Sequence, residues 1–308
     1  MRLQLSNFCK GIINLKSEIR TRPSIRDYVA VLKPRETSLL VFIGACSALV
    51  AASTINGAFP AISFVLTIIA ITMGSAGANG LTNYLDRDVD ARMQRTCRRP
   101  LAAGRIRPPE KALSMIIILL IAGLVLAWIL APICFVIGLI GIMSSGIFRK
   151  TISCTFLGII AGSAPVLIGW YAITKYTEFA MAPLIYFCMI ALWTPLHVWT
   201  LMLSNRSDYE NAGLRYFPLS WEDKKVIRLL AILSVALAAV AVLNYFVVTG
   251  FHWLYLSVAI VLSVLMVAAN LNLMRSPTSN NSWVVYKLSA FPYLGIIFAA
   301  MVLDVWLL

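Results

Sequence analysis

The sequence predicts an all-helical, polytopic membrane protein with nine transmembrane helices. Of the 308 residues, 60% are hydrophobic and only 13% are charged, whereas about a quarter of the residues in a soluble domain are charged. The stretches between the charged groups are about as long as a helix needs to cross roughly 30 Å of hydrocarbon. Helices are expected there because unpaired backbone groups are too costly within a bilayer. The nine stretches are Thr37–Ile55, Pro60–Tyr84, Ala112–Leu130, Pro132–Phe148, Ile152–Thr174, Phe179–Leu203, Val226–Val248, Trp253–Leu273 and Leu288–Leu303.

The distribution of positive charge supports nine spans and predicts their orientation. The least marked boundary lies between Ala112 and Phe148, where 37 residues carry no charge and only Ala131-Pro132 indicates a turn. A single helix there would invert every later segment. With nine spans, 25 of the 26 Lys and Arg residues fall on one side and only Lys175 falls on the other. Because positive residues accumulate in cytoplasmic loops, the N-terminus is expected in the cytosol and the C-terminus outside.

The rest of the composition points to one membrane domain. Residues 1–35 are basic and lack an apolar signal core, so they are expected to form a cytosolic lead-in to a single transmembrane domain at 36–308. Topology and attraction to anionic lipid account for the net charge of +13, so no nucleic-acid partner is expected. The six cysteines have no paired spacing, which predicts neither a disulfide framework nor a zinc site.

A stripe of acids and amides marks the inner end of the second span. Asn79, Asn83, Asp86 and Asp90 are spaced 4, 3 and 4 residues apart, so they fall within about a 60° arc of a helix, with Asp88 on the opposite side. Like charges one turn apart repel unless a cation neutralises them, and oxygen ligands suit Mg²⁺ that is bridged to phosphate. The stripe therefore indicates a magnesium–phosphate site.

Arginines follow this stripe directly. Arg95, Arg98 and Arg99 can bind phosphate oxygens bidentately and can stabilise a departing diphosphate. A run of arginines alone is more typical of a positive-inside flank, and the acids alone could form a solvated helix end that pairs with Arg87 and Arg92. The adjacency of acids and arginines favours an anion site.

The end of the sixth span repeats the arrangement. His197, Ser204 and Asp208 are spaced 7 and 4 residues apart and share one stripe if the helix continues. Asp208 could hold a second metal ion, although a solvated helix end remains the simpler alternative. An ionisable residue within a span, such as His197, is a functional candidate, but a lone histidine is often a packing residue. The flanking residues are Arg206, Tyr209 and Arg215.

Small residues are concentrated in the fifth span, after Arg149-Lys150-Thr151. They allow helices to pack closely and can also leave a groove for an apolar substrate, of which close packing is the expected role. The residues are Gly158, Ala161, Gly162, Ser163, Ala164 and Gly169.

Three segments carry a family resemblance that covers about Arg26 to the C-terminus. They are Asn83 to Asp90 followed by Met93, Arg95, Thr96, Arg99 and Pro100; Arg149-Lys150-Thr151 followed by Gly162 to Trp170; and Thr194 to Leu201 followed by Asp208-Tyr209 and Ala212-Gly213. These residues resemble the UbiA superfamily of intramembrane prenyltransferases. Within it, the Met-x-Arg-Thr-x-x-Arg-Pro-Leu run and the segment from His197 to Gly213 are similar to the branch that farnesylates heme.

The resemblance implies nine helices around a central cavity, capped by two cytosolic loops, in the cell's inner membrane. The implied reaction is Mg²⁺-assisted transfer of farnesyl from farnesyl diphosphate to heme B, with water added, giving heme O and diphosphate. Contact with heme-modifying or oxidase-assembly proteins would fit this role. The implied site comprises Asp86, Asp90 and Asp208 as catalytic acids and, with Asn83, as metal ligands; Arg95, Arg99 and Lys150 for the diphosphate; and His197, Arg206, Tyr209 and Arg149 for the acceptor.

Departures from the family pattern leave alternatives open. The usual Asn before the first Asp is Thr82 here, with Asn83 one step later, and Cys154 replaces another usual Asn. A proline-rich stretch is shortened to residues 214–218. The first alternative is a UbiA-type enzyme that prenylates a quinone precursor or another aromatic acceptor. The second is a secondary transporter, although its ion sites would be expected near the bilayer midplane in paired repeats.

Overall fold

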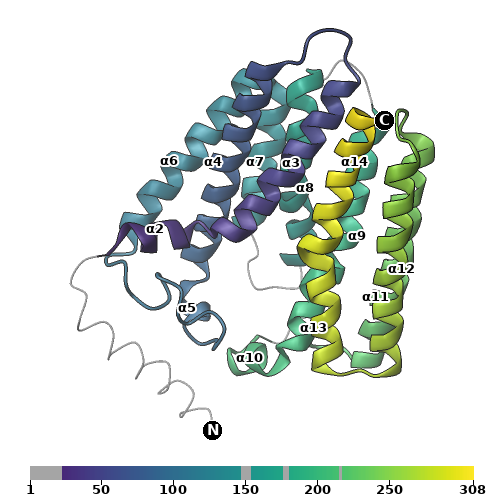
Figure 1. The fold of residues 1–308 in the computed structure, drawn as a ribbon. Coiled ribbons are helices and arrows are strands. Elements are labelled where there is room, and N and C mark those ends of the chain that lie inside the picture. Colours follow the sequence, from purple (N-terminus) through teal and green to yellow (C-terminus); the bar gives the residue numbers. More distant parts are fainter. Residues whose placement is uncertain (1–22, 147–153, 176–179, 215–216) are drawn as a thin grey trace.

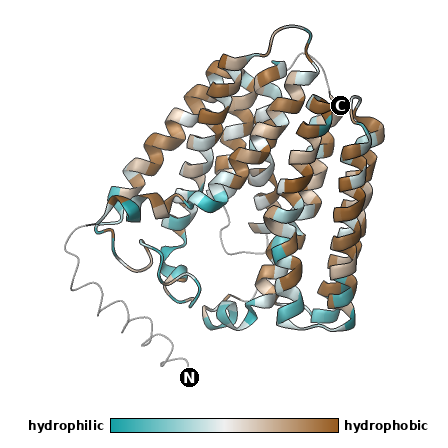
Figure 2. Ribbon diagram, viewed as in Figure 1, coloured by the Kyte–Doolittle hydropathy of each residue, from teal (hydrophilic) through white to brown (hydrophobic). Residues whose placement is uncertain are grey.

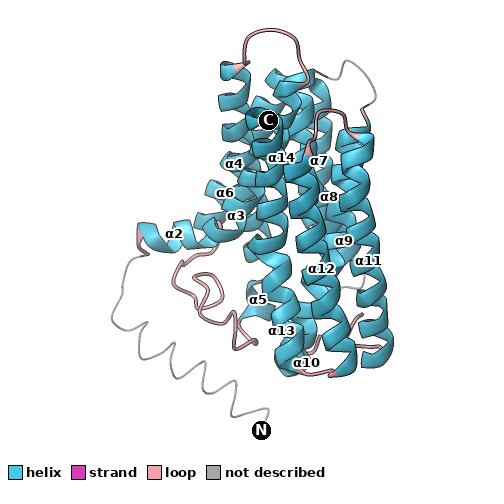
Figure 3. Cartoon of the chain, turned by 45° about the vertical axis from the view of Figure 1, so that its right-hand side comes forward, coloured by secondary structure: helices cyan, strands magenta, loops and turns pink. Residues whose placement is uncertain are grey.

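The computed structural model describes residues 23–146, 154–175, 180–214 and 217–308, which form a bundle of helices (Figure 1). Its described parts contain helices and loops without β-strands (Figure 3). The helices are α2 (Ile25–Val31), α3 (Pro34–Ser53), α4 (Ala61–Leu85), α5 (Arg87–Asp90), α6 (Glu110–Leu130), α7 (Pro132–Gly146), α8 (Cys154–Thr174), α9 (Met181–Ser204), α10 (Arg206–Asn211), α11 (Asp223–Val247), α12 (Trp253–Arg275), α13 (Ser279–Leu288), the π-helical segment η1 (Ser289–Gly295) and α14 (Ile296–Leu307).

The long helices have the length and composition of membrane spans. In the described part of the chain, eight helices meet both criteria, with α13, η1 and α14 counted as one helix of 29 residues. Helix α7 is apolar and shorter, at 15 residues. Hydrophobic residues cover the length of the bundle, and hydrophilic residues gather at the end that carries α5 and α10 (Figure 2). We call this the polar end. The all-helical membrane fold predicted from the sequence is confirmed.

The uncertain boundary in the charge-free stretch is a true break between helices. Helix α6 ends at Leu130, and Ala131 is extended, with φ −164° and ψ 142°. Helix α7 then begins at Pro132, where a missing N–H is tolerated at the first position of a helix. The two-helix interpretation of this stretch, on which the later topology depends, is confirmed.

The last span is longer than predicted. It was expected to begin at Leu288, but the helix begins at Ser279, where the Thr278 side chain accepts a hydrogen bond from the backbone N–H of Asn281. The polar cap residues favour helix initiation before the apolar stretch starts. Lys287 consequently lies on a helix and not in a loop. The prediction of a helix start at Leu288 is wrong, because hydropathy does not detect a polar first turn.

Close backbone contact joins α3 to α8. A side chain added at Gly169 would clash with the carbonyl oxygen of Gly44. Nearby, the Ser47 hydroxyl donates a 2.8 Å hydrogen bond to the carbonyl oxygen of Val166. Small residues allow this approach, as the sequence of α8 predicted.

Helix α2 lies across the polar end of the bundle (Figures 1 and 3). Its first turn has a capping box formed by Ser24 and Asp27, and the Asp27 carboxylate also lies 2.8 Å from Nε of Arg105. Partial burial raises the pKa of Asp27, but the hydrogen bonds from Ser24 and the ion pair with Arg105 outweigh it, so the pKa lies below its usual value. The pair attaches α2 to the loop between α5 and α6.

Candidate active site

The acidic stripe lies where α4 meets α5. Asp86 caps α4, and helical hydrogen bonding continues across the junction, with Asp90 N–H donating to the Asp86 carbonyl at 2.8 Å. Asn83, Asp86 and Asp90 are 3%, 4% and 1% exposed. The Asp88 side chain is 84% exposed. The structure therefore places three predicted ligands on one buried side and Asp88 on the other, as the spacing predicts.

Asn83 offers an oxygen that suits a cation. Its Nδ2 donates a 2.6 Å hydrogen bond to the carbonyl of Val31, at the end of α2. Its Oδ1 is buried and has no hydrogen-bond partner among the residues that the structure describes. A buried acceptor without a partner is costly. With two buried carboxylates nearby in the chain, this oxygen fits Mg²⁺, which takes oxygen ligands and needs only one or two carboxylates when phosphate completes its shell.

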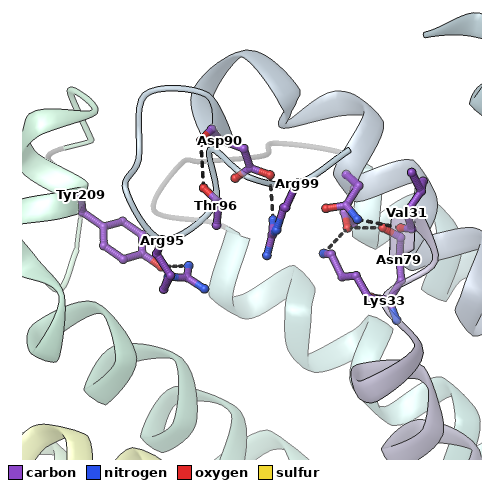
Figure 4. A network of polar contacts seen from close by, with 10 residues as sticks. Val31, Lys33, Asn79, Asp90, Arg95, Thr96, Arg99 and Tyr209 are labelled. Atoms are coloured by element: carbon purple, nitrogen blue, oxygen red, sulfur yellow. Dashed lines mark hydrogen bonds and ion pairs between the residues drawn. The ribbon is translucent and has the colours of Figure 1, made fainter. Parts of the chain in front are cut away.

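Two arginines extend from the loop after α5 (Figure 4). Nη1 of Arg99 lies 2.7 Å from Oδ2 of Asp90, and the Thr96 hydroxyl donates to the Asp90 carbonyl oxygen at 3.0 Å. Nη2 of Arg95 donates to the Tyr209 hydroxyl oxygen at 3.3 Å. Met93, fully buried, anchors the loop. The chain therefore holds a guanidinium directly beside the acidic stripe.

Asp208 joins the two polar loops. Its carboxylate accepts hydrogen bonds from the backbone N–H groups of Gln94 at 2.7 Å and Arg95 at 3.2 Å. Within the described ranges, no group of three or more His, Cys, Asp or Glu side chains is arranged to hold a metal ion. The metal-ligand role of Asp208 stays a prediction. The structure shows that its carboxylate holds the loop of residues 91–109, which carries Arg95 and Arg99 and which we call the arginine loop.

The expectation of one helical stripe from His197 to Asp208 is wrong. Helix α9 ends at Ser204, and Asn205 leaves helical geometry with φ −120° and ψ 28° before α10 begins. His197 faces the last span, where its ring contacts Tyr286 and its Nδ1 lies 3.1 Å from the Ser289 hydroxyl oxygen. Asp208 instead faces the arginine loop. A one-residue break at a helix end redirects every later side chain.

The other predicted acceptor residues have different surroundings. Arg206 pairs with Asp223 and, at 3.3 Å, with Glu210. Burial raises the pKa of Tyr209 despite the neighbouring Arg95, so its phenol is protonated at neutral pH. Arg149 and Lys150, as well as Arg215, lie outside the described residues.

An apolar cavity of about 290 Å³ extends to Lys33, Asn79 and Thr82, close in the chain to the acidic stripe. Its walls come from α4, α6, α7 and α8 and are made mostly of small residues. Those of α8 are Gly158, Ala161, Gly162 and Ala164, so part of the small-residue run lines a cavity where close packing was expected. Gly169, by contrast, packs closely against Gly44 of α3.

Lys33 stands at the polar rim of this cavity and was not singled out in the sequence. It has φ 48°, in the left-handed region, immediately before Pro34 starts α3. Its ammonium donates a 2.8 Å hydrogen bond to the Thr82 hydroxyl, one turn before Asp86. Both residues line the cavity, as does Asn79, whose amide donates to Thr37 at 3.0 Å. In the sequence, Lys33 is indistinguishable from a positive-inside flank.

Buried acids and a guanidinium group, one helical turn beyond Thr82 at the wall of an apolar cavity, form a candidate site that suits a substrate with an anionic head and an apolar tail. The chain belongs to the UbiA prenyltransferase family, whose model matches residues 39–294.

Similar proteins agree with this membership. The protoheme IX farnesyltransferase of Desulforudis audaxviator is 34% identical over 298 residues, which cover 93% of this chain and 92% of that protein. The protoheme IX farnesyltransferase of Symbiobacterium thermophilum is also 34% identical, over 94% of this chain and 97% of that protein.

Solved structures share the fold. Digeranylgeranylglyceryl phosphate synthase superposes with a TM-score of 0.75 at 19% identity, covering 92% of this chain and 99% of the other. A UbiA homolog from Archaeoglobus fulgidus, bound to GPP and Mg²⁺, superposes with a TM-score of 0.60 at 15% identity, covering 89% and 99%. The protein is accordingly a membrane-embedded prenyltransferase by family.

Proposed function

We propose that the protein transfers the farnesyl group of farnesyl diphosphate to heme B, with addition of water, forming heme O and diphosphate. The observation that carries this proposal is the cluster of Asp86, Asp90 and Arg99 one helical turn beyond Thr82, which lines an apolar cavity. Relatives named protoheme IX farnesyltransferase, matched along nearly their whole length, support heme as the acceptor.

Asn83, Asp86 and Asp90 would hold Mg²⁺. When bound there, the ion supplies Lewis-acid stabilisation of the negative charge on the departing diphosphate. Asp208 belongs to the proposed metal set because a carboxylate oxygen has lone pairs to spare while it accepts a backbone N–H. The two loops would then close over the same ligand.

Arg95, Arg99 and Lys150 would bind the oxygens of the diphosphate. Arg99 can do so without leaving Asp90, because a guanidinium has five N–H donors and its ion pair with Asp90 uses one nitrogen. Charge-assisted hydrogen bonds of this kind are strongest where water is excluded. Of this set, Arg99 is the residue that contacts an acid of the stripe, since its Nη1 lies 2.7 Å from Oδ2 of Asp90.

The farnesyl tail would occupy the cavity between α4, α6, α7 and α8. Its walls are apolar, which excludes water from the allylic cation that develops as the C–O bond breaks. The Thr82 and Lys33 side chains, at the rim, would separate the apolar tail from the anionic head. The cavity thereby directs the reactive carbon toward the acids.

His197, Arg206, Tyr209 and Arg149 would bind the heme acceptor. The Tyr209 oxygen accepts a hydrogen bond from Arg95, and its protonated hydroxyl can donate to an oxygen of a substrate. Arg206 would have to release Asp223 or share it with a heme propionate. Because Arg206 is already paired with Asp223, His197 is the better candidate of the two for recognition of the porphyrin ring.

The polar end is proposed to face the cytosol of a cell whose inner membrane holds the protein, because the nine-span topology predicted from the sequence assigns 25 of the 26 Lys and Arg residues to that side. Heme is amphiphilic, so delivery and removal at this end would suit contact with heme-modifying or oxidase-assembly proteins. Labelling of single cysteines placed at residues 20 and 308 tests the orientation. The two labels are expected on opposite sides, and labels on one side would contradict nine spans.

The proposal predicts that diphosphate binding and heme use can be disrupted by different substitutions, and this can be tested. Affinity for a farnesyl diphosphate analogue is measured with and without Mg²⁺, beside the yield of farnesylated heme. Asp86→Asn should weaken Mg²⁺-dependent analogue binding, whereas His197→Ala should lower heme yield and leave analogue binding nearly intact. Prenylation of an aromatic acid, with no heme product, would instead favour the alternative acceptor class.

A further inference from the structure

Aromatic rings connect α9 to the last span within the bundle. The His197 imidazole stacks on Trp193, with centroids 4.8 Å apart and planes at 14°, and contacts Tyr286 at 4.6 Å. Tyr286 in turn stacks on Trp283 at 4.9 Å. The Trp193 indole N–H also donates to the carbonyl of Ser289. These contacts hold the plane of the imidazole ring.

Hydrogen bonding determines which nitrogen of His197 carries the proton. The Ser289 hydroxyl donates its single proton to the carbonyl oxygen of Tyr286 at 2.9 Å. In that arrangement the same hydroxyl oxygen, 3.1 Å from His197 Nδ1, is left to accept a hydrogen bond. This assigns the ring hydrogen to Nδ1. A doubly protonated ring is costly inside a membrane span without a carboxylate partner, so Nε2 bears a lone pair.

The other ring nitrogen, Nε2, is the one available to a ligand by its hydrogen bonding. His197 is partly exposed, whereas its neighbours Pro195 and Leu196 are buried. Nε2 forms no hydrogen bond with any residue in the described part of the chain. An imidazole whose Nδ1–H is bound by a second group, and whose plane is held, has the arrangement typical of a protein ligand to a metal.

We propose that Nε2 of His197 is an axial ligand to the iron of the heme acceptor, and that Ser289 is the residue that positions it by fixing the tautomer. This inference rests on the proposed function. The lone pair of Nε2 occupies an axial position of the iron and displaces any water bound there, with no change in oxidation state. His197 lies seven residues before the end of α9, about 10 Å into the helix. The iron would thus lie within the apolar region, with the propionates toward Tyr209 and Arg206.

Spectroscopic titration with two porphyrins tests the inference. The full chain, purified without a polyhistidine tag, is titrated with ferric heme B and with metal-free protoporphyrin IX. His197→Ala should abolish the Soret shift of nitrogen ligation and weaken ferric heme binding on the order of tenfold or more, while leaving metal-free protoporphyrin unaffected. His252→Ala removes the other of the two histidines and is the matched control, with no change expected.

Ser289 supplies the second test. Ser289→Ala should give a weaker, mixed Soret signal, and Ser289→Thr, which keeps the hydroxyl, should restore it. Added imidazole should restore the ligated spectrum of His197→Gly. Binding of a farnesyl diphosphate analogue reports that each variant is folded, and His197→Gln replaces His197→Ala if the latter is not.

Three results would overturn axial ligation. One is an unchanged ferric heme spectrum in His197→Ala and His197→Gln. Another is an equal loss of affinity for ferric heme B and for metal-free protoporphyrin IX, which would indicate that His197 has a packing role. The third is loss of turnover with an unchanged spectrum, which would indicate a base. A ligated wild-type spectrum without any farnesylated heme would instead support ligation and contradict the proposed function.

Discussion

The carboxylate of Asp208 accepts a 2.7 Å hydrogen bond from the backbone N–H of Gln94, which lies 114 residues away in the sequence. Asp208 follows α9, and Gln94 follows α5. The contact holds the arginine loop against α10, so the two polar segments meet at the polar end of the bundle.

Replacing Asp208 should loosen the arginine loop. Asp208→Ala removes the acceptor for two backbone N–H groups, each bond to a charged group contributing on the order of 1.5–3 kcal/mol. Hydrogen exchange at Gln94 and Arg95 should accelerate by about tenfold or more. Glu210→Ala, on the same helix but paired with Arg206, should leave that exchange unchanged. Equal exchange in all three proteins would contradict the loop-ordering role.

The buried acids should differ sharply from their exposed neighbour. Asp86→Asn and Asp90→Asn each remove a charge from the buried side, and we expect turnover to fall by on the order of a hundredfold or more. Asp88→Asn should have a mild effect because its side chain points away. Steady-state rates at several Mg²⁺ concentrations make the measurement. Similar losses in all three variants would show that the stripe does not define the site.

Much of this site follows from local sequence patterns. Residues one helical turn apart share a face wherever helical hydrogen bonding continues, as it does from α4 into α5, so the spacing of Asn83, Asp86 and Asp90 predicted their common side. The helical spans likewise follow from apolar length. The break between Leu130 and Pro132 was visible as a proline in a charge-free run.

The remaining features depend on contacts that no local pattern encodes. The hydrogen bond from Gln94 to Asp208 joins loops far apart in the chain, and the end of α9 at Asn205 has no strong sequence signal. Lys33 reaches the cavity only because its backbone is left-handed. The partner of His197 could not be predicted either, because Ser289 lies in a π-helical segment that shifts the register of the last span.

Substitution of a glycine that lines the cavity should affect substrate choice, whereas substitution of a glycine at the α3–α8 contact should affect stability. A side chain at Gly74 meets nothing within 4 Å, and the residue lines the cavity, whereas one at Gly169 meets the backbone of α3. Gly74→Leu should fold normally but discriminate against farnesyl diphosphate relative to geranyl diphosphate. Gly169→Leu should lower the thermal unfolding temperature or prevent folding. If a folded Gly74→Leu protein keeps the chain-length preference of the wild type, the farnesyl tail does not bind in this cavity.

Asp304, in α14, should contribute to stability and not to chemistry. Its fully buried carboxylate accepts hydrogen bonds from the backbone N–H groups of His252 and Tyr255, at the start of α12. Asp304→Ala leaves these donors unpaired, a loss of about 1–3 kcal/mol. Thermal unfolding in detergent should shift downward while analogue binding stays unchanged. A loss of analogue affinity at temperatures where the variant is folded would contradict the assignment.

The identity of the product tests the central claim most directly. Purified protein is incubated with heme B, farnesyl diphosphate and Mg²⁺ in ¹⁸O-labelled water, and the extracted hemes are analysed by mass spectrometry. The account predicts heme B that has gained one farnesyl group and one labelled hydroxyl, with the yield lost in Asp86→Asn. Recovery of unmodified heme B by a protein that binds the diphosphate analogue would contradict it.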